Sequence, residues 1–126
     1  PPRYYYNETE VIGVPDKNTK TNARLDEDEG RYLTTGLPIH KYAFKTTTLR
    51  NISLTAPYMH NGVFKTLEDV LDFYNNGGGK GLHIAPPNQT LPFEKLNLTR
   101  AEQQDIIAFL KTLTDTALSK SSVLHP

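Results

Sequence analysis

Apolar residues recur at helical spacing in only two stretches of the sequence. Within residues 67–74 and again within 100–113 they fall three or four positions apart, which predicts one short helix and one longer amphipathic helix. Thr66 and Thr99 stand directly before these stretches, each with an acidic residue three positions later, as in the capping box of a helix N-terminus. The glycines at 77–79 are expected to end the first helix.

Long polar stretches separate these helices and carry little periodic signal. Residues 7–36 are rich in charges and turn formers, and residues 80–98 are rich in proline, so both predict long loops. Residues 44–57 alternate weakly and contain several threonines, which predicts extended chain with at most a short strand. Short apolar anchors interrupt the first loop at Val11, Ile12, Val14, Tyr32 and Leu33. The expected fold class is mainly α with long loops.

Two helices cannot easily fill a core among so many loop residues. Ordering each loop residue costs about 1 to 2 kcal/mol of backbone entropy, which must be offset by buried apolar surface. We therefore expect something outside the chain to complete the core. A large planar cofactor held by a neighbouring polypeptide would supply the missing apolar surface.

Composition excludes several classes of protein. The chain has 126 residues, enough for one domain, and its 14 Lys and Arg balance 14 Asp and Glu, so its charge indicates no nucleic-acid partner. The absence of cysteine excludes disulfides and thiolate metal sites. No apolar run reaches the roughly 20 residues of a membrane span. Because the chain begins at Pro1 without an initiator Met or a signal peptide, we expect a processed protein or a piece of a longer one.

Residues able to bind haem iron gather after Pro57. Tyr58, Met59 and His60 follow one another, and Tyr74 lies fourteen positions after His60. Tyr, Met and His side chains all serve as axial ligands of haem iron. A chain with its own c-type haem needs a Cys-x-x-Cys-His attachment motif, which this sequence lacks. The candidate ligands are therefore present without an anchor for the cofactor.

Residues 44–78, FKTTTLRNISLTAPYMHNGVFKTLEDVLDFYNNGG, resemble the C-terminal haem domain of bacterial di-haem cytochrome c peroxidases and their MauG-type relatives. The segments that carry this resemblance are Phe44-Lys45, Thr48 to Asn51, Leu54 to Tyr58, His60 to Gly62 and Thr66 to Glu68. Upstream, Gly13 to Asp16 and Glu29 to Tyr32 resemble the linker after the haem-attachment helix, and residues 98–115 resemble the closing helix. The resemblance covers about residues 7–115.

The sequence departs from the family pattern in two ways. Thr47 stands where the family usually has proline, which affects the stiffness of the loop more than its chemistry. The family also carries two Cys-x-x-Cys-His motifs N-terminal to this region, and this chain has neither. The resemblance thus implies that the anchor lies upstream, on a separate or cleaved chain.

The resemblance implies a partial domain. Residues 1–126 would form the C-terminal part of a c-type cytochrome domain, completed by a missing N-terminal haem-bearing segment. Residues 1–43 would be a linker-like segment, 44–115 the haem-contacting core and 116–126 a tail. The implied cofactors are haem c, attached to the missing segment, and calcium.

Tyr74 occupies the position at which the family places the distal ligand of its second haem, a methionine in the classical peroxidases and a tyrosine in MauG-type enzymes. A phenolate stabilises ferric iron and lowers the potential, so the resemblance implies a MauG-like haem. The alternative is a tyrosine that ends its helix with the ring in the core. Met59, the only methionine, is a rival ligand whose alternative role is packing.

The resemblance also implies roles for four further residues. His60 would lie near the second haem, with a catalytic role in hydrogen bonding or proton transfer. The backbone carbonyls of Thr55 and Pro57 would bind the calcium ion. Arg50 is a candidate for a buried arginine that holds a haem propionate or a backbone corner. The remaining histidines match no motif and are predicted to lie on the surface: His40, His83 and His125.

The function that the resemblance implies is that of a di-haem peroxidase, to which this chain would contribute a ligand and scaffold while being inactive alone. The implied partners are an N-terminal haem-bearing chain or segment, a redox partner protein and hydrogen peroxide, in the periplasm or another extracytoplasmic compartment. One alternative is a non-enzymatic electron-transfer or assembly subunit of a larger, membrane-associated complex. Another is a haem-free interaction module descended from the peroxidases.

Overall fold

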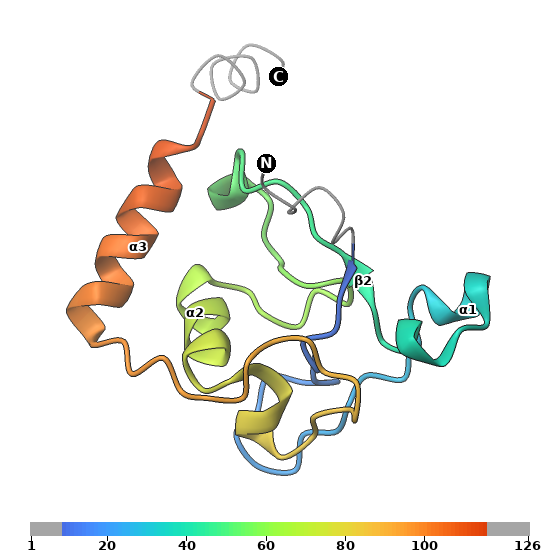
Figure 1. Cartoon of the computed structure of the whole chain (residues 1–126). Helices are drawn as coiled ribbons and strands as arrows, with labels where there is room; N and C mark the ends of the chain where they lie inside the picture. Colours follow the sequence, from blue (N-terminus) through green and yellow to red (C-terminus); the bar gives the residue numbers. More distant parts are fainter. Residues whose placement is uncertain (1–8, 116–126) are drawn as a thin grey trace, which may run out of the picture.

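The computed structural model describes residues 9–115 of the chain, and Figure 1 shows their arrangement. The helices are α1 (Tyr32–Thr35), α2 (Leu67–Asn75) and α3 (Arg100–Thr112). Three single turns of 3-10 helix accompany them: η2 (Pro38–His40), η3 (Ile52–Leu54) and η4 (Gly78–Leu82). The only sheet among the described residues is an antiparallel pair, β1 (Thr9–Glu10) with β2 (Phe44–Lys45). The remainder is irregular, as the long polar stretches predict.

The first predicted helix is confirmed as α2. Thr66 is its N-cap, and the Thr66 hydroxyl accepts a hydrogen bond of 3.1 Å from the backbone N–H of Asp69. Leu67 and Phe73 are its buried residues, which leaves the rest of the helix at the edge of the core. The helix ends at Asn75, and η4 begins at Gly78 within the predicted glycine run.

The second predicted helix is confirmed as α3, with a complete capping box. The Thr99 hydroxyl accepts from the backbone of Glu102 at 3.2 Å, and the Glu102 carboxylate accepts from the backbone of Thr99 at 2.8 Å. Its buried stripe is narrower than the apolar pattern predicts, because only Ile107 and Leu110 are buried and Phe109 is 60% exposed. Within residues 9–115, no segment buries the outer part of the stripe.

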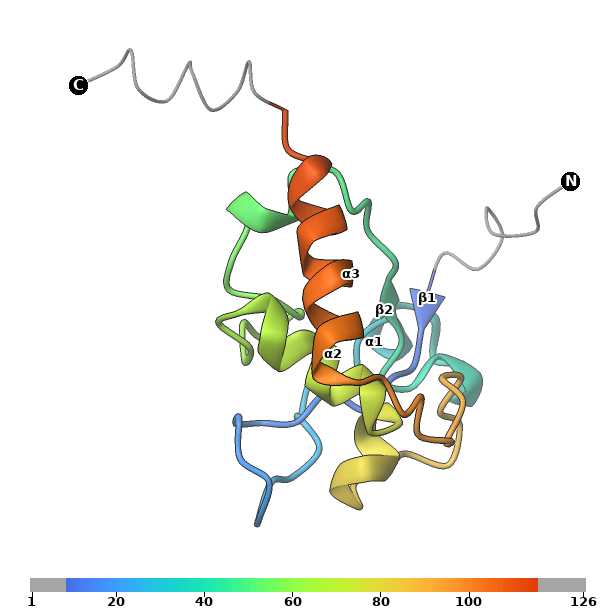
Figure 2. The ribbon, with the colours of Figure 1, turned by 90° about the vertical axis from the view of Figure 1, so that its left-hand side faces the viewer.

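The core lies where α2, α3 and the chain between them meet. Figures 1 and 2 show α3 lying beside α2, and the two helices contact each other. The rings of Phe64 and Phe73 are 5.2 Å apart between centroids. The buried members of this cluster are Tyr58, Phe64, Leu67, Phe73, Ile107 and Leu110. The expectation that something outside the chain completes this core stays a prediction.

The first loop is pinned at both ends, although one of its predicted apolar anchors is wrong. Near its end, the backbone N–H of Arg31 donates to the Ala43 carbonyl at 2.9 Å. Val11 is 1% exposed, and the backbone N–H of Thr90 donates to its carbonyl at 2.8 Å, so the two long loops lie together. Val14 is 5% exposed. Leu33 is 71% exposed, so its prediction as an apolar anchor is wrong. The reason is that residues 32–35 form α1, which carries no buried side chain.

No helix within residues 9–115 has the length and apolar character needed to cross a membrane. The predicted division at residue 43 stays a prediction. The tail at 116–126 lies outside the described residues.

Candidate functional site

The turn at residues 57–62 carries three of the candidate ligand residues, and Tyr58 is committed to the core. Its backbone N–H donates to the Phe64 carbonyl at 2.7 Å, and its hydroxyl donates to the Ile52 carbonyl at 2.9 Å. Tyr58 is 9% exposed. Because its ring is packed and its hydroxyl is hydrogen-bonded, Tyr58 fixes the start of the turn that carries Met59 and His60.

His60 turns away from the core cluster and contacts residues far away in the sequence. Its Nε2 atom lies 2.9 Å from Oδ1 of Asp26, and its ring stacks on that of Phe44, with centroids 3.6 Å apart and 5° between the planes. The backbone of the residue is exposed, but its side chain is only 15% exposed. The imidazole is therefore held by contacts from two other segments.

Asp26 is a residue that the sequence analysis did not single out. Its carboxylate accepts hydrogen bonds from His60, from the Asn61 amide at 3.0 Å and from the backbone N–H of Asp28 at 3.0 Å. Burial alone would raise the pKa of Asp26, but these hydrogen bonds outweigh it and hold the pKa below its ordinary value. In the sequence, Asp26 stands in the acidic run DEDE, which is typical of a solvated loop. Its partners His60 and Asn61 lie more than thirty residues away, so no local pattern connects them to Asp26.

Tyr74 lies on the last turn of α2 and packs against the core cluster. Its ring meets that of Phe73 edge-on, with centroids 5.8 Å apart. Its hydroxyl makes no hydrogen bond within residues 9–115, although the side chain is half-buried. Burial, together with the negative charge of Glu10, raises the pKa of the Tyr74 phenol. Among the described residues, the Tyr74 oxygen therefore has no hydrogen-bond partner that would compete with a ligand.

Met59 packs against the same cluster as Tyr74, from the turn. Its backbone has a φ of 69°, in the left-handed region that side-chain-bearing residues seldom adopt. The structure thus brings both candidate iron ligands to one cluster and places His60 elsewhere. The packing role weighed for Met59 fits its half-buried position.

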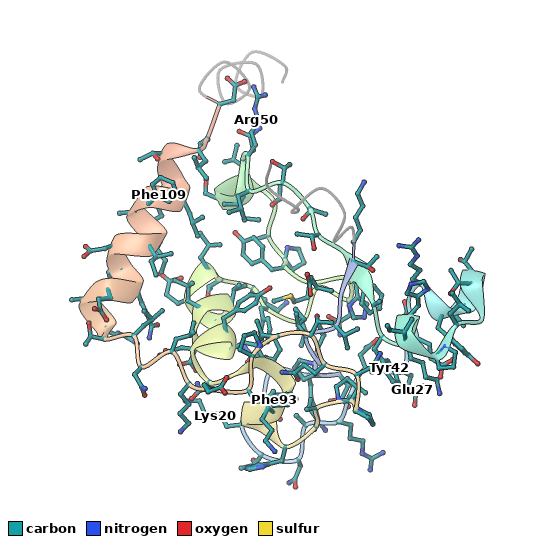
Figure 3. All side chains as sticks on the ribbon, in the orientation of Figure 1. Lys20, Glu27, Tyr42, Arg50, Phe93 and Phe109 are labelled. Atoms are coloured by element: carbon teal, nitrogen blue, oxygen red, sulfur yellow. The ribbon has the colours of Figure 1, made fainter. Side chains whose placement is uncertain are left out.

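Arg50 is not buried, so that part of its prediction is wrong for this chain. Its side chain is 70% exposed and pairs with Asp115 at 3.0 Å, beside the end of the described chain (Figure 3). The neighbouring Asn51 is half-buried instead, and its amide oxygen accepts from the Asp115 backbone at 2.6 Å. Arg50 remains free to point at a group outside the chain.

The predicted calcium ligands lie on an exposed turn. Thr55 and Pro57 are both exposed, and neither carbonyl accepts a hydrogen bond within residues 9–115. In the same part of the chain there is no group of three or more His, Cys, Asp or Glu side chains that could hold a metal ion. A calcium site here would therefore rest on carbonyl oxygens and on ligands from elsewhere.

No known protein-family model matches the chain, but individual proteins do. The cytochrome-c peroxidase IdrP2 of Pseudomonas sp. strain SCT is 51% identical over 75 residues, which is 60% of this chain and 18% of that protein. The cytochrome-c peroxidase IdrP1 of Denitromonas iodatirespirans is 41% identical over 91 residues, 72% of this chain and 23% of that protein. The methylamine utilization protein MauG of Methylorubrum extorquens is 35% identical over 88 residues, 70% of this chain and 24% of that protein.

A solved structure agrees in fold. The crystal structure of a MauG-like protein associated with microbial copper homeostasis superimposes with a TM-score of 0.64 at 37% identity, over 85% of this chain and 32% of that one. The chain belongs with the bacterial cytochrome c peroxidases and MauG proteins. It spans 18% to 24% of the length of the three curated relatives named above.

The prediction that the other three histidines lie on the surface is confirmed only in part. His83 is exposed, whereas His40 is half-buried, with Nδ1 2.9 Å from the Thr35 hydroxyl. His125 lies outside the described residues.

A cleft of about 220 Å³ lies beside α2 and contains none of the predicted site residues. Phe64, Phe73 and Leu82 contribute to its wall, and Lys20 approaches Asp72 to 3.7 Å across its rim. Tyr74 does not line this cleft, so the hollow and the candidate ligand belong to different sides of α2.

Proposed function

We propose that this chain is the C-terminal portion of a MauG-like di-haem c-type peroxidase, in which Tyr74 supplies the distal ligand of the second haem. The observation that carries the proposal is the Tyr74 phenol, half-buried and without a hydrogen bond within residues 9–115, on a chain similar to MauG. Tyrosine is an established axial ligand of haem iron. The whole protein would be an oxidoreductase, and this chain alone would be inactive.

The chain offers two of the features that a haem site needs. Within residues 9–115 the Tyr74 oxygen has no hydrogen-bond partner, and Phe109, Leu54 and Leu49 leave apolar surface exposed that a partner would cover. The proximal ligand and the covalent attachment would come from a segment N-terminal to this chain, because the chain has no cysteine. Bound there, haem would supply an iron that stores and relays oxidising equivalents derived from hydrogen peroxide.

The chain's own part in this chemistry is to position Tyr74 and to hold its proton until a cation binds. Because burial and Glu10 raise the pKa of the phenol, Tyr74 is neutral without a cation opposite it, and ligation as phenolate must release its proton. The contact with Phe73 and the packing of α2 on the cluster fix the direction of the ring. The phenol is thereby set in place before the iron meets it.

The other site residues take supporting parts. His60 would hydrogen-bond or carry protons near the second haem, and Met59 would pack beside Tyr74 rather than bind iron. Arg50 is exposed and able to reach a haem propionate from its pair with Asp115. The unbonded carbonyls of Thr55 and Pro57 would serve as calcium ligands, completed by water and by the missing segment. A periplasmic location follows from the place where c-type haem is attached in such proteins.

The test uses the complete protein that contains this chain. A pyridine haemochrome spectrum should show c-type haem, and steady-state assays with a reduced electron donor should show peroxide turnover. Absence of c-type haem would overturn the assignment altogether. Haem without peroxide turnover would favour the alternative of a non-enzymatic electron-transfer or assembly subunit.

A further inference from the structure

Three segments of the chain, around residues 14, 26 and 60, meet at Asp26. The loop at 57–62 reaches Asp26 through both His60 and Asn61, and Asp26 is held in turn by the backbone of Asp28. Its own N–H donates to the Val14 carbonyl at 3.0 Å. The Asp26 and His60 side chains are 22% and 15% exposed, so this pair is mostly withdrawn from water.

The arrangement determines which nitrogen of His60 carries the proton. An ionised carboxylate only accepts hydrogen bonds, so Nε2 at 2.9 Å from Oδ1 must be the protonated nitrogen. No hydrogen bond within residues 9–115 involves Nδ1 of His60. In the neutral ring Nδ1 therefore keeps its lone pair free.

The ring is held in orientation as well as in tautomer. The Phe44 ring lies parallel to the imidazole, with centroids 3.6 Å apart, which prevents the imidazole from tilting. The next residue, Asn61, is fixed because its amide donates to both Asp26 and the Pro15 carbonyl. In functional histidines, packing against the ring and a hydrogen bond to one ring nitrogen usually fix the orientation and the tautomer of the imidazole.

We propose that Asp26 is the positioning residue of His60, fixing the Nε2–H tautomer so that Nδ1 is the nitrogen presented for hydrogen bonding or proton transfer. This inference rests on the role given to His60 under the proposed function. The proposal adds Asp26 as the partner of His60 and Nδ1 as the His60 atom that would hydrogen-bond or transfer protons.

The tautomer can be read directly by nitrogen NMR of the complete reduced protein labelled with ¹⁵N-histidine. The spectrum of His60→Gln identifies the His60 signals by their loss. In the neutral ring of the wild type, Nε2 should be the protonated nitrogen. A wild-type His60 protonated at Nδ1 would overturn the proposal, and that result requires no Asp26 variant to fold.

Asp26→Ala should weaken the preference for the Nε2–H tautomer. Oδ1 of Asp26 accepts from both His60 Nε2 and the Asp28 backbone N–H, so an amide at this position would keep its oxygen there, whereas alanine removes the acceptor altogether. The His60 ring of the folded variant should therefore show a larger share of the Nδ1–H tautomer than the wild type. An unchanged His60 tautomer in a folded Asp26→Ala protein would overturn the proposal.

The matched control is Asp28→Ala, which removes the same charge two positions away. Within residues 9–115 the Asp28 side chain accepts one hydrogen bond, from the backbone N–H of Gly30 at 2.8 Å, and none joins it to His60. Its His60 tautomer should equal that of the wild type. Because the readout is a proton position rather than turnover, it stands apart from the test of the peroxidase assignment.

Discussion

Gly13 and Gly79 bring their backbones into direct contact. A Cβ built on Gly13 would lie 2.7 Å from Cα of Gly79, and one built on Gly79 would lie 2.8 Å from Cα of Gly13. The N–H of Gly79 donates to the Ile12 carbonyl at 2.9 Å, so the first loop is fastened to the turn after α2. This contact holds the base of the helix that carries Tyr74.

Gly13→Ala should therefore destabilise the protein strongly. The residue has a φ of 74°, and the added methyl group has no space against the Gly79 backbone. Left-handed strain and overpacking together predict a loss of about 2 to 5 kcal/mol, measured by urea unfolding of the complete protein. The control is Gly36→Ala, at a φ of 66° with nothing within 4 Å, which should cost only about 1 to 2 kcal/mol. Equal losses in the two variants would contradict the close approach.

The lowered pKa of Asp26 should make the free energy of unfolding depend on pH in the acidic range. Its folded pKa lies below the ordinary value of 3.8, so its contribution is fully present above that value and is lost as the pH falls through the folded pKa. Unfolding free energies between pH 6 and 3 should fall less steeply in Asp26→Asn than in the wild type. Parallel curves would show that the hydrogen bonds from His60 and Asn61 do not form in solution.

The features predicted correctly from sequence are those encoded within a few residues. Thr66 and Thr99 cap their helices because the cap and its partner are three positions apart. The Asp26–His60 pair joins residues thirty-four positions apart, and no local pattern connects them. The exposure of Leu33 and Phe109 was missed for a related reason, since apolar spacing predicts a buried face without saying what covers it.

The site shows the same division. The resemblance drew attention to Tyr74, Met59 and His60, and the structure separates them, with two on the core cluster and one on Asp26. Arg50 is a candidate from sequence for a buried arginine, yet its side chain is 70% exposed, and it is the neighbouring Asn51 that is half-buried. Which neighbour turns inward depends on the left-handed backbone at Asn51, with a φ of 61°, which spacing does not reveal.

The capping box of α3 should contribute measurably to stability. Thr99→Ala removes the hydroxyl that accepts from Glu102 and should cost about 1 kcal/mol. Amide exchange in the first turn of α3 should accelerate accordingly. The control is Thr112→Ala, in the last turn of the same helix, where the exposed hydroxyl donates to the Phe109 carbonyl and the loss should stay below about 0.5 kcal/mol. A larger loss at Thr112 than at Thr99 would contradict this assignment of the cap.

The last prediction concerns Tyr74 and separates it from Met59 as the iron ligand. Tyr74→Phe keeps the ring and its edge-on contact with Phe73, and the lost hydroxyl has no hydrogen bond within residues 9–115, so the fold should be nearly as stable as the wild type. Loss of the phenolate should change the ferric absorption spectrum of the complete protein and raise the potential of that haem.

Two further variants complete the comparison. Tyr74→Met should raise the potential and stabilise the ferrous form, because a thioether favours ferrous iron. Met59→Leu should leave the ferric spectrum unchanged, since leucine fills a similar volume against the cluster. The reverse pattern, a wild-type spectrum in both Tyr74 variants and an altered one in Met59→Leu, would make Met59 the ligand. The turn at 57–62 would then bind the iron directly, and α2 would serve only to pack behind it.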